Sequence, residues 1–423
     1  MQWKMLLNEA IDRARRGDLP EAVVLFDQVL RIEPTYSKAY YNKACALSDL
    51  GQINAAVAAF SEAIQLNPLY VNAYLNRGNL YRKQGDYVAA MADFEAALQI
   101  QPDSAKAYGS RGLTYLSQGY CKAAIGDLDQ AIAYSPKFAK LYLWRGCAYL
   151  KLENCTKAIA DFNTALTYKP SLADAYHSRG LAYMSLGNLY QASADMNQAI
   201  ELNPELVEAY SNRGILRHKL GDTEGAVADY QRVMTLTSEL PSSQMPMAVV
   251  DVQEKTPKQK GSGVTQTYEK TRTSPFLRAE VYSNRGNLRA ELGDALGAIA
   301  DYTKALSIDP DKAYIYNSRG LLRFQVGQYE SAITDFDEAI RREPTYATAY
   351  NNRGNAHYFT GNAKAALNDF SQALKLDPNL AEAYISRAQA RAATNDSEGA
   401  VLDYQRALHL RELHCGNALS EMN

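Results

Sequence analysis

The chain has 423 residues, which is enough for two or three ordinary domains or for one long array of repeats. Its 45 basic and 47 acidic side chains nearly balance, which argues against a dedicated nucleic-acid surface. The sequence has no run of about 18 apolar residues, and residues 1–17 are too charged for a signal peptide, so we expect neither a membrane span nor a secretory leader. Its five scattered cysteines are typical of reduced thiols and favour a cytoplasmic location.

Taken in chain order, the sequence repeats itself with a period of 34 residues. Prolines mark the end of successive copies: Pro34, Pro68, Pro102, Pro136, Pro170, Pro204, Pro310, Pro344 and Pro378. When places are counted from Ser37 as place 1, place 4 is tyrosine in ten copies: Tyr40, Tyr74, Tyr108, Tyr142, Tyr176, Tyr210, Tyr282, Tyr316, Tyr350 and Tyr384. Place 8 is glycine or alanine and place 20 is alanine in every copy.

Each copy predicts two helices joined by a tight turn. Glycines stand where the first helix ends and the chain needs a left-handed residue: Gly51, Gly85, Gly119, Gly187, Gly221, Gly293, Gly327 and Gly361. Glu153 and Asn395 hold this position in two other copies. The recurring proline ends the second helix. Small residues at places 8 and 20 let the two helices approach closely, and large residues at places 4 and 24 fill the gaps between pairs.

This pattern resembles the tetratricopeptide repeat (TPR), whose 34-residue unit carries an aromatic residue, a glycine, a later alanine, a phenylalanine and a proline. The resemblance spans eleven copies and implies an all-α fold, a right-handed α-solenoid or superhelix of about eleven helix-turn-helix repeats. We expect seven repeats over 3–240, a flexible insert containing proline, glycine and lysine over 241–278, four repeats over 279–412, and a short tail over 413–423.

Two charged places recur together. Place 7 is arginine and place 23 is aspartate in the same nine copies: Arg77 and Asp93, Arg111 and Asp127, Arg145 and Asp161, Arg179 and Asp195, Arg213 and Asp229, Arg285 and Asp301, Arg319 and Asp335, Arg353 and Asp369, and Arg387 and Asp403. The second copy has Lys43 and Ala59 instead. Two residues that face each other across an antiparallel helix pair have place numbers whose sum is nearly constant. The sum is near 30 for places 7 and 23 and for places 8 and 20, so we expect both pairs to be in contact. We predict nine ion pairs that fix the register of the two helices more than they add stability.

The sequence offers no catalytic or metal-binding constellation. It lacks the GxxxxGK[ST], HExxH and CxxC patterns, and no serine or cysteine is placed with a histidine to form a triad. We therefore expect no enzyme activity, no metal and no cofactor.

In TPR proteins the first helices line the concave face, and the resemblance implies the same here. Place 6 is asparagine or serine in ten of eleven copies, and Trp144 holds it in the remaining one. An asparagine amide both donates and accepts, so it can bind a peptide main chain. The series resembles the asparagine ladder in the TPR arm of O-GlcNAc transferases, although tight packing of the first helices would also favour a small polar residue.

The predicted partner-binding groove has a polar and an apolar part. The polar part comprises Asn42, Asn76, Asn79, Asn212, Asn284, Asn287, Asn317, Asn351, Asn352 and Asn355. The apolar part comprises Leu113, Leu143, Trp144, Leu181 and Ile215. An apolar patch flanked by polar side chains suits an extended or helical partner segment. Packing between neighbouring repeats is the alternative explanation for the apolar part.

Two functions fit these features. The first is a non-catalytic scaffold or assembly factor that binds protein or peptide ligands in its groove. The second is a regulatory or substrate-recruiting arm for an enzyme on another chain. The last repeat has too little chain after it for a full capping helix, so its outer face stays open to a partner, and weak homo-association through this repeat would cover it.

Overall fold

The computed structural model describes residues 2–239 and 274–420, and every regular element in this part of the chain is an α-helix. The helices fall into two compact units, one with α1–α12 and the other with α13–α22. The first unit contains α1 (Gln2–Arg15), α2 (Leu19–Ile32), α3 (Ser37–Asp49), α4 (Ile53–Leu66), α5 (Val71–Gln84), α6 (Tyr87–Ile100), α7 (Ala105–Ser117), α8 (Cys121–Tyr134), α9 (Ala139–Lys151), α10 (Cys155–Tyr168), α11 (Ala173–Ser185) and α12 (Leu189–Leu202). The second contains α13 (Val207–Lys219), α14 (Thr223–Glu239), α15 (Ser274–Glu291), α16 (Ala295–Ile308), α17 (Ala313–Gln325), α18 (Tyr329–Arg342), α19 (Ala347–Phe359), α20 (Ala363–Leu376), α21 (Ala381–Ala393) and α22 (Ser397–Ser420).

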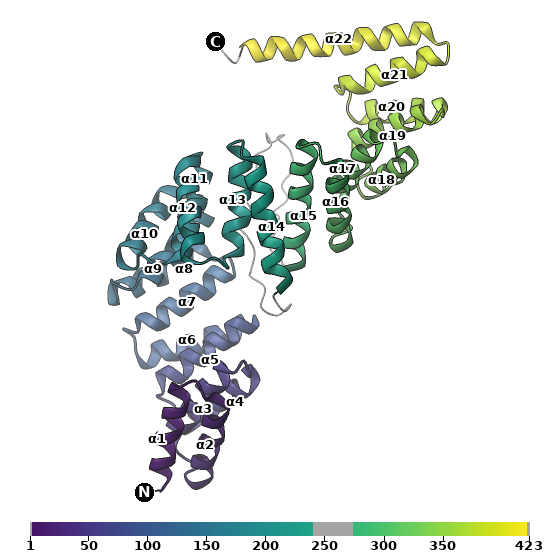
Figure 1. Ribbon diagram of the computed structural model, residues 1–423. Coiled ribbons are helices and arrows are strands. Elements are labelled where there is room, and N and C mark those ends of the chain that lie inside the picture. The colour runs from purple at the N-terminus through teal and green to yellow at the C-terminus, as the bar shows by residue number, and fades with distance from the viewer. Residues whose placement is uncertain (1, 240–273, 421–423) are drawn as a thin grey trace. The chain divides into compact units, whose positions relative to one another are not determined.

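Within each unit the helices stack as pairs. Each odd-numbered helix packs against the even-numbered helix that follows it, and that helix packs against the first helix of the next repeat (Figure 1). Each pair matches one 34-residue copy of the sequence. The predicted all-α solenoid of helix-turn-helix repeats is therefore confirmed.

The turn between the two helices of a repeat needs a residue with a positive φ angle. All eight glycines predicted for this position have one, with φ between 75° and 85°. Glu153 and Asn395, which replace glycine in two repeats, are the only described non-glycine residues with a positive φ, at 59° and 64°. The sequence pattern thus predicted the backbone conformation even where the residue type differs.

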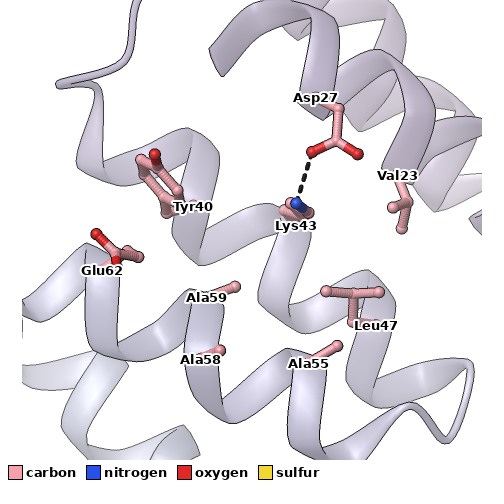
Figure 2. Close-up of a pocket in the computed structure, with 9 residues that line it drawn as sticks. All are labelled: Val23, Asp27, Tyr40, Lys43, Leu47, Ala55, Ala58, Ala59 and Glu62. Atoms are coloured by element: carbon pink, nitrogen blue, oxygen red, sulfur yellow. Dashed lines mark ion pairs between the residues drawn. The ribbon is translucent and has the colours of Figure 1, made fainter. Parts of the chain in front are cut away.

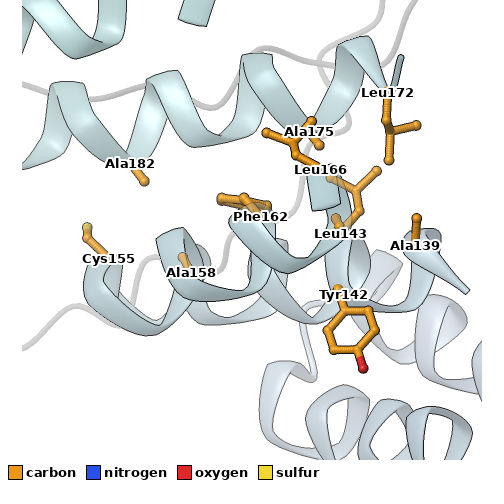
Figure 3. Packing of buried hydrophobic residues seen from close by; sticks show 11 residues of the cluster. Ala139, Tyr142, Leu143, Cys155, Ala158, Phe162, Leu166, Leu172, Ala175 and Ala182 are labelled. Carbon is orange, nitrogen blue, oxygen red and sulfur yellow. The ribbon is translucent and has the colours of Figure 1, made fainter. Parts of the chain in front are cut away.

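Glycine at place 8 allows the two helices of a repeat to touch. A Cβ atom on Gly146 would lie 2.6 Å from Cε1 of Phe162, the large side chain at place 24. Phe162 is fully buried. Figure 3 shows it among the other residues of its cluster, which come mainly from α9, α10 and α11. The core is therefore a series of small clusters, each shared by one helix pair and the next helix.

The nine predicted arginine–aspartate pairs are all present. Each joins the first and second helix of its repeat, with a shortest nitrogen–oxygen distance between 2.5 and 2.7 Å. In the third repeat, Nε and Nη2 of Arg77 donate to the two carboxylate oxygens of Asp93 at 2.9 and 2.7 Å. Each of these guanidinium groups also lies 5.4–5.8 Å from the ring centre of the tyrosine at place 4.

Two helix ends differ from the predicted boundaries. Helix α15 begins at Ser274, so residues 274–278 of the predicted insert are helical. Pro275 is compatible with this start, because a proline in the first turn removes no helical hydrogen bond. Helix α22 continues to Ser420 and includes most of the predicted tail, since no proline stops it. The remainder of the predicted insert, 241–273, lies outside the described residues.

Candidate protein-binding surface

The apolar part of the predicted groove centres on Trp144 in α9. This half-buried side chain packs beside Gly109 of the preceding repeat, where an added Cβ would lie 3.6 Å from the indole ring. Phe138, which is 49% exposed, makes an edge contact with it at 6.5 Å between ring centres. Leu113 is also half-buried. The first unit therefore presents an accessible aromatic pair, of which sequence reasoning found Trp144 and missed Phe138.

The polar side chains at place 6 connect neighbouring repeats. Nδ2 of Asn76 donates to the hydroxyl of Tyr41 at 3.0 Å and to Sγ of Cys45 at 3.7 Å. In the second unit, Nδ2 of Asn352 donates to Oδ1 of Asn317 at 3.0 Å. An asparagine side chain has two N–H donors and a carbonyl acceptor, so these bonds use only part of its capacity. Both explanations of the asparagine series, packing between repeats and ligand binding, are therefore compatible with this geometry.

Burial divides the predicted groove residues into two groups. Five are buried, with exposed fractions of 2–8%: Leu143, Leu181, Asn212, Asn317 and Asn351. Ten are half-buried or exposed: Asn42, Asn76, Asn79, Leu113, Trp144, Ile215, Asn284, Asn287, Asn352 and Asn355. Leu143 packs in the cluster shared by α9, α10 and α11 of the next repeat. A ligand in the groove would meet the second group directly.

Three titratable groups on the first helices are uncharged near pH 7. Burial raises the pKa of Tyr41 to about 12 and that of the Cys147 thiol to about 11. Burial lowers the pKa of His177 to about 4, so its imidazole is uncharged at neutral pH. These three groups therefore add hydrogen-bonding capacity without charge.

The second unit carries two features that the sequence analysis did not find. Oδ1 of Asn351 and Oγ of Ser283, both at place 5, are buried and have no hydrogen-bond partner among the described residues. Phe324, Tyr329 and Phe359 form an aromatic cluster with ring centres 5.2–5.6 Å apart, and Phe359 is 60% exposed. The repeat pattern gave no signal for this cluster, because no other copy has an aromatic residue at the place of Phe359.

No group of three or more potential metal ligands occurs among the described residues. No described helix is long and apolar enough to cross a membrane.

Stacked helix pairs with this spacing of small and aromatic residues define an all-α helical-repeat protein. Models of the tetratricopeptide repeat match residues 41–105, 148–187, 180–221, 207–239, 286–327, 320–361 and 347–380. Together these segments cover more than half of the chain, which therefore belongs to the TPR family. Proteins of this family bind other proteins or peptides, and no catalytic family is matched.

Several solved structures are similar to this chain. A tetratricopeptide repeat protein from Parabacteroides merdae is 20% identical, with a TM-score of 0.45 over 66% of this chain and 95% of that one. MamA from Desulfovibrio magneticus RS-1 is 24% identical, with a TM-score of 0.38 over 40% and 96%. YrrB, described as a TPR protein with an unusual peptide-binding site, is 22% identical, with a TM-score of 0.34 over 43% and 93%. No curated protein matches the sequence.

Proposed function

We propose that this chain is a non-catalytic scaffold or assembly factor that binds extended peptide segments of partner proteins along its first helices. The proposal rests on the accessible aromatic pair of Trp144 and Phe138, which lies along the same series of helices as the uncharged asparagine and serine side chains at place 6. Exposed tryptophan is a frequent binding hot spot, because it buries a large apolar area at little entropic cost.

The two units contribute different contacts. In the first unit, an apolar side chain of the ligand packs against Trp144 and Leu113. The side-chain oxygen of Asn76 accepts from the main chain of the ligand, because both N–H groups of Asn76 already donate to Tyr41 and Cys45. In the second unit, the half-buried amides of Asn352 and Asn355 bind the main chain of the ligand. Main-chain binding of this kind selects for an extended segment more than for a particular sequence.

Affinity purification followed by crosslinking and mass spectrometry tests this function. We expect wild-type protein to retain partners that a Trp144→Ala variant loses, because truncating a hot-spot tryptophan costs about 2 kcal/mol or more of binding free energy. Tyr190→Ala is the matched control, since Tyr190 is an 81% exposed aromatic residue on the second helix α12. Retention of every partner by a Trp144, Asn284 and Asn352 triple alanine variant would refute binding by the first helices.

The same experiment separates the scaffold from the alternative, an arm that serves an enzyme on another chain. Recovery of one catalytic polypeptide as the dominant partner supports the arm, and recovery of several unrelated partners supports the scaffold. The cytoplasmic location and the lack of nucleic-acid binding remain proposals based on the scattered cysteines and the balanced charge.

Weak homo-association through the C-terminal repeat is a second part of the proposal. In the ten preceding repeats the side chain at place 24 is at most 3% exposed, whereas Tyr404 in α22 is 44% exposed. At place 28, Leu374 is 7% exposed and Leu408 is 60% exposed. In the preceding repeats of each unit, the following repeat covers places 24 and 28. The same face of a second copy would cover them here, in a symmetric contact.

A further inference from the structure

The second repeat contains a pocket, and no other described repeat has the same lining residues at the corresponding places. It has a volume of about 410 Å³ and lies between α2, α3 and α4 (Figure 2). Its lining consists of Val23, Asp27, Tyr40, Lys43, Leu47, Ala55, Ala58, Ala59 and Glu62. None of these residues belongs to the predicted groove, so the pocket is a feature separate from the proposed peptide-binding face.

The pocket exists because three places carry smaller side chains here. Place 7 is Lys43 and place 23 is Ala59, so the arginine–aspartate pair of nine other repeats is missing. Place 11 is Leu47, where the later repeats have tyrosine, arginine or histidine. The Lys43 ammonium binds Asp27 of the preceding repeat at 2.5 Å and leaves the space over Ala59 open.

The missing arginine also leaves an aromatic ring without its usual cation. In nine repeats a guanidinium lies over the tyrosine at place 4, but no described cation lies over Tyr40. Glu62 is next to Tyr40 on the pocket wall and makes no ion pair with any described residue (Figure 2). An aromatic face and a carboxylate side by side attract a cation.

The ninth repeat shows what these two places bind when a guanidinium is available. Tyr316 and Glu338 hold places 4 and 26, as Tyr40 and Glu62 do in the second repeat. The guanidinium of Arg342 lies 4.3 Å from the ring centre of Tyr316 and forms an ion pair with Glu338. Arg342 is at place 30, and the second repeat has Leu66 there.

We propose that the pocket of the second repeat binds an arginine side chain from a partner protein. The guanidinium lies against Tyr40 and pairs with Glu62, as Arg342 does with Tyr316 and Glu338. The aliphatic stem packs against Ala58, Ala59 and Leu47, a surface that suits the apolar part of a long cationic side chain. Arginine is favoured over lysine because its planar group stacks on a ring and bonds a carboxylate at the same time.

The probe for this site is the peptide acetyl-Ala-Ala-Arg-Ala-Ala-amide, studied by saturation-transfer NMR with the full chain. Its twin carries citrulline, which has nearly the shape of arginine and no charge. We expect saturation of the arginine side-chain protons and a signal at least about fivefold weaker from the citrulline peptide, because the ion pair and the cation–π contact need the charge.

Two variants make the test specific. Leu66→Arg supplies an arginine at place 30, as in the ninth repeat, and should fill the pocket and reduce the peptide signal at least about fivefold. Leu202→Arg is the matched control: Leu66 and Leu202 are both 37% exposed at place 30, but Gln198 stands at place 26 beside Leu202. This control should keep the signal within about twofold.

Several outcomes would overturn the proposal: equal signals from the two peptides, no signal from either, or an unchanged signal after Leu66→Arg. Circular dichroism verifies that the variants are folded, and Glu62→Gln provides a second substitution that removes only the charge and should weaken the signal similarly. Trp144→Ala should leave the signal unchanged, so failure of this site and failure of the proposed groove are distinguishable.

Discussion

The arginine at place 7 makes more contacts than its sequence pattern predicts. In the fifth repeat, Nε and Nη2 of Arg145 donate to Asp161, while Nη1 donates to Asp129 of the preceding repeat at 2.6 Å. Hydrogen bonding to Asp161 is the largest cause that raises the pKa of Arg145, so its guanidinium stays charged. One side chain thus fixes the register inside its own repeat and the stacking on its neighbour.

Glu153 occupies a backbone conformation that disfavours its side chain. Its φ of 59° is left-handed, a region that costs residues with a Cβ atom about 1–2 kcal/mol. We predict that Glu153→Gly increases the free energy of unfolding by about 1 kcal/mol, because glycine adopts this conformation without that cost. The midpoint of urea unfolding, followed by circular dichroism, measures the change.

Asn395 provides the comparison for Glu153. Its φ is 64°, but asparagine tolerates the left-handed region better than glutamate, so Asn395→Gly should gain less than half as much. Glu153→Gln removes the charge and keeps the Cβ atom, so it should change the midpoint little. A gain from Glu153→Gln equal to that from Glu153→Gly would show that charge, and not backbone strain, is responsible.

At the scale of helices, the closest contact is between place 8 and place 24. We predict that Gly146→Ala lowers the free energy of unfolding by about 1–3 kcal/mol, since its Cβ would lie 2.6 Å from Phe162 and must push the helices apart. Gly126→Ala is the control, because Gly126 is inside α8 with open space around its Cβ position. This control should gain about 0.5–1 kcal/mol from helix propensity.

The midpoints of thermal and urea unfolding should therefore fall for Gly146→Ala and rise for Gly126→Ala. Equal destabilisation would mean that any added methyl group disturbs the array. Equal stabilisation would mean that the helices separate easily at place 8, and the account of close packing between α9 and α10 would be wrong.

The sequence predicted those contacts that recur from repeat to repeat. Places 7 and 23, places 8 and 20, and the left-handed turn recur often enough that their pairing follows from the period alone, whereas the contact of place 8 with place 24 was not predicted. Contacts made by departures in single repeats have no periodic signal. Arg342 over Tyr316, Trp144 beside Gly109, and the cluster around Phe359 are of this kind.

Burial limited the prediction of the groove in a similar way. Residues at place 5 were assigned to the groove by resemblance, yet Leu143, Asn317 and Asn351 are buried. Whether a first-helix residue reaches solvent depends on the size of its neighbour in the adjacent repeat. The place number alone does not determine this size. Place 6 and place 9 are less affected, and most of the accessible residues are there.

At the scale of the whole molecule, a repeat array has ends that its repeats do not cover. Each internal repeat buries its second helix under the next repeat, and α22 has no described successor. Val401, Leu402 and Leu408 are 55%, 60% and 60% exposed on this helix. Terminal repeats commonly carry a polar outer face. An apolar face at this position therefore favours a contact with another molecule over exposure to water.

If a second copy covers this face, the mass in solution depends on concentration. We predict that sedimentation equilibrium shows a weight-average mass rising above the 46.8 kDa of one chain as concentration increases. Leu408→Lys should weaken the association about tenfold or more, because it places a charge in an apolar contact. Leu296→Lys, at a 69% exposed leucine on α16, should leave the association unchanged. A mass that stays at one chain throughout, or equal effects of the two lysine variants, would rule out association through α22.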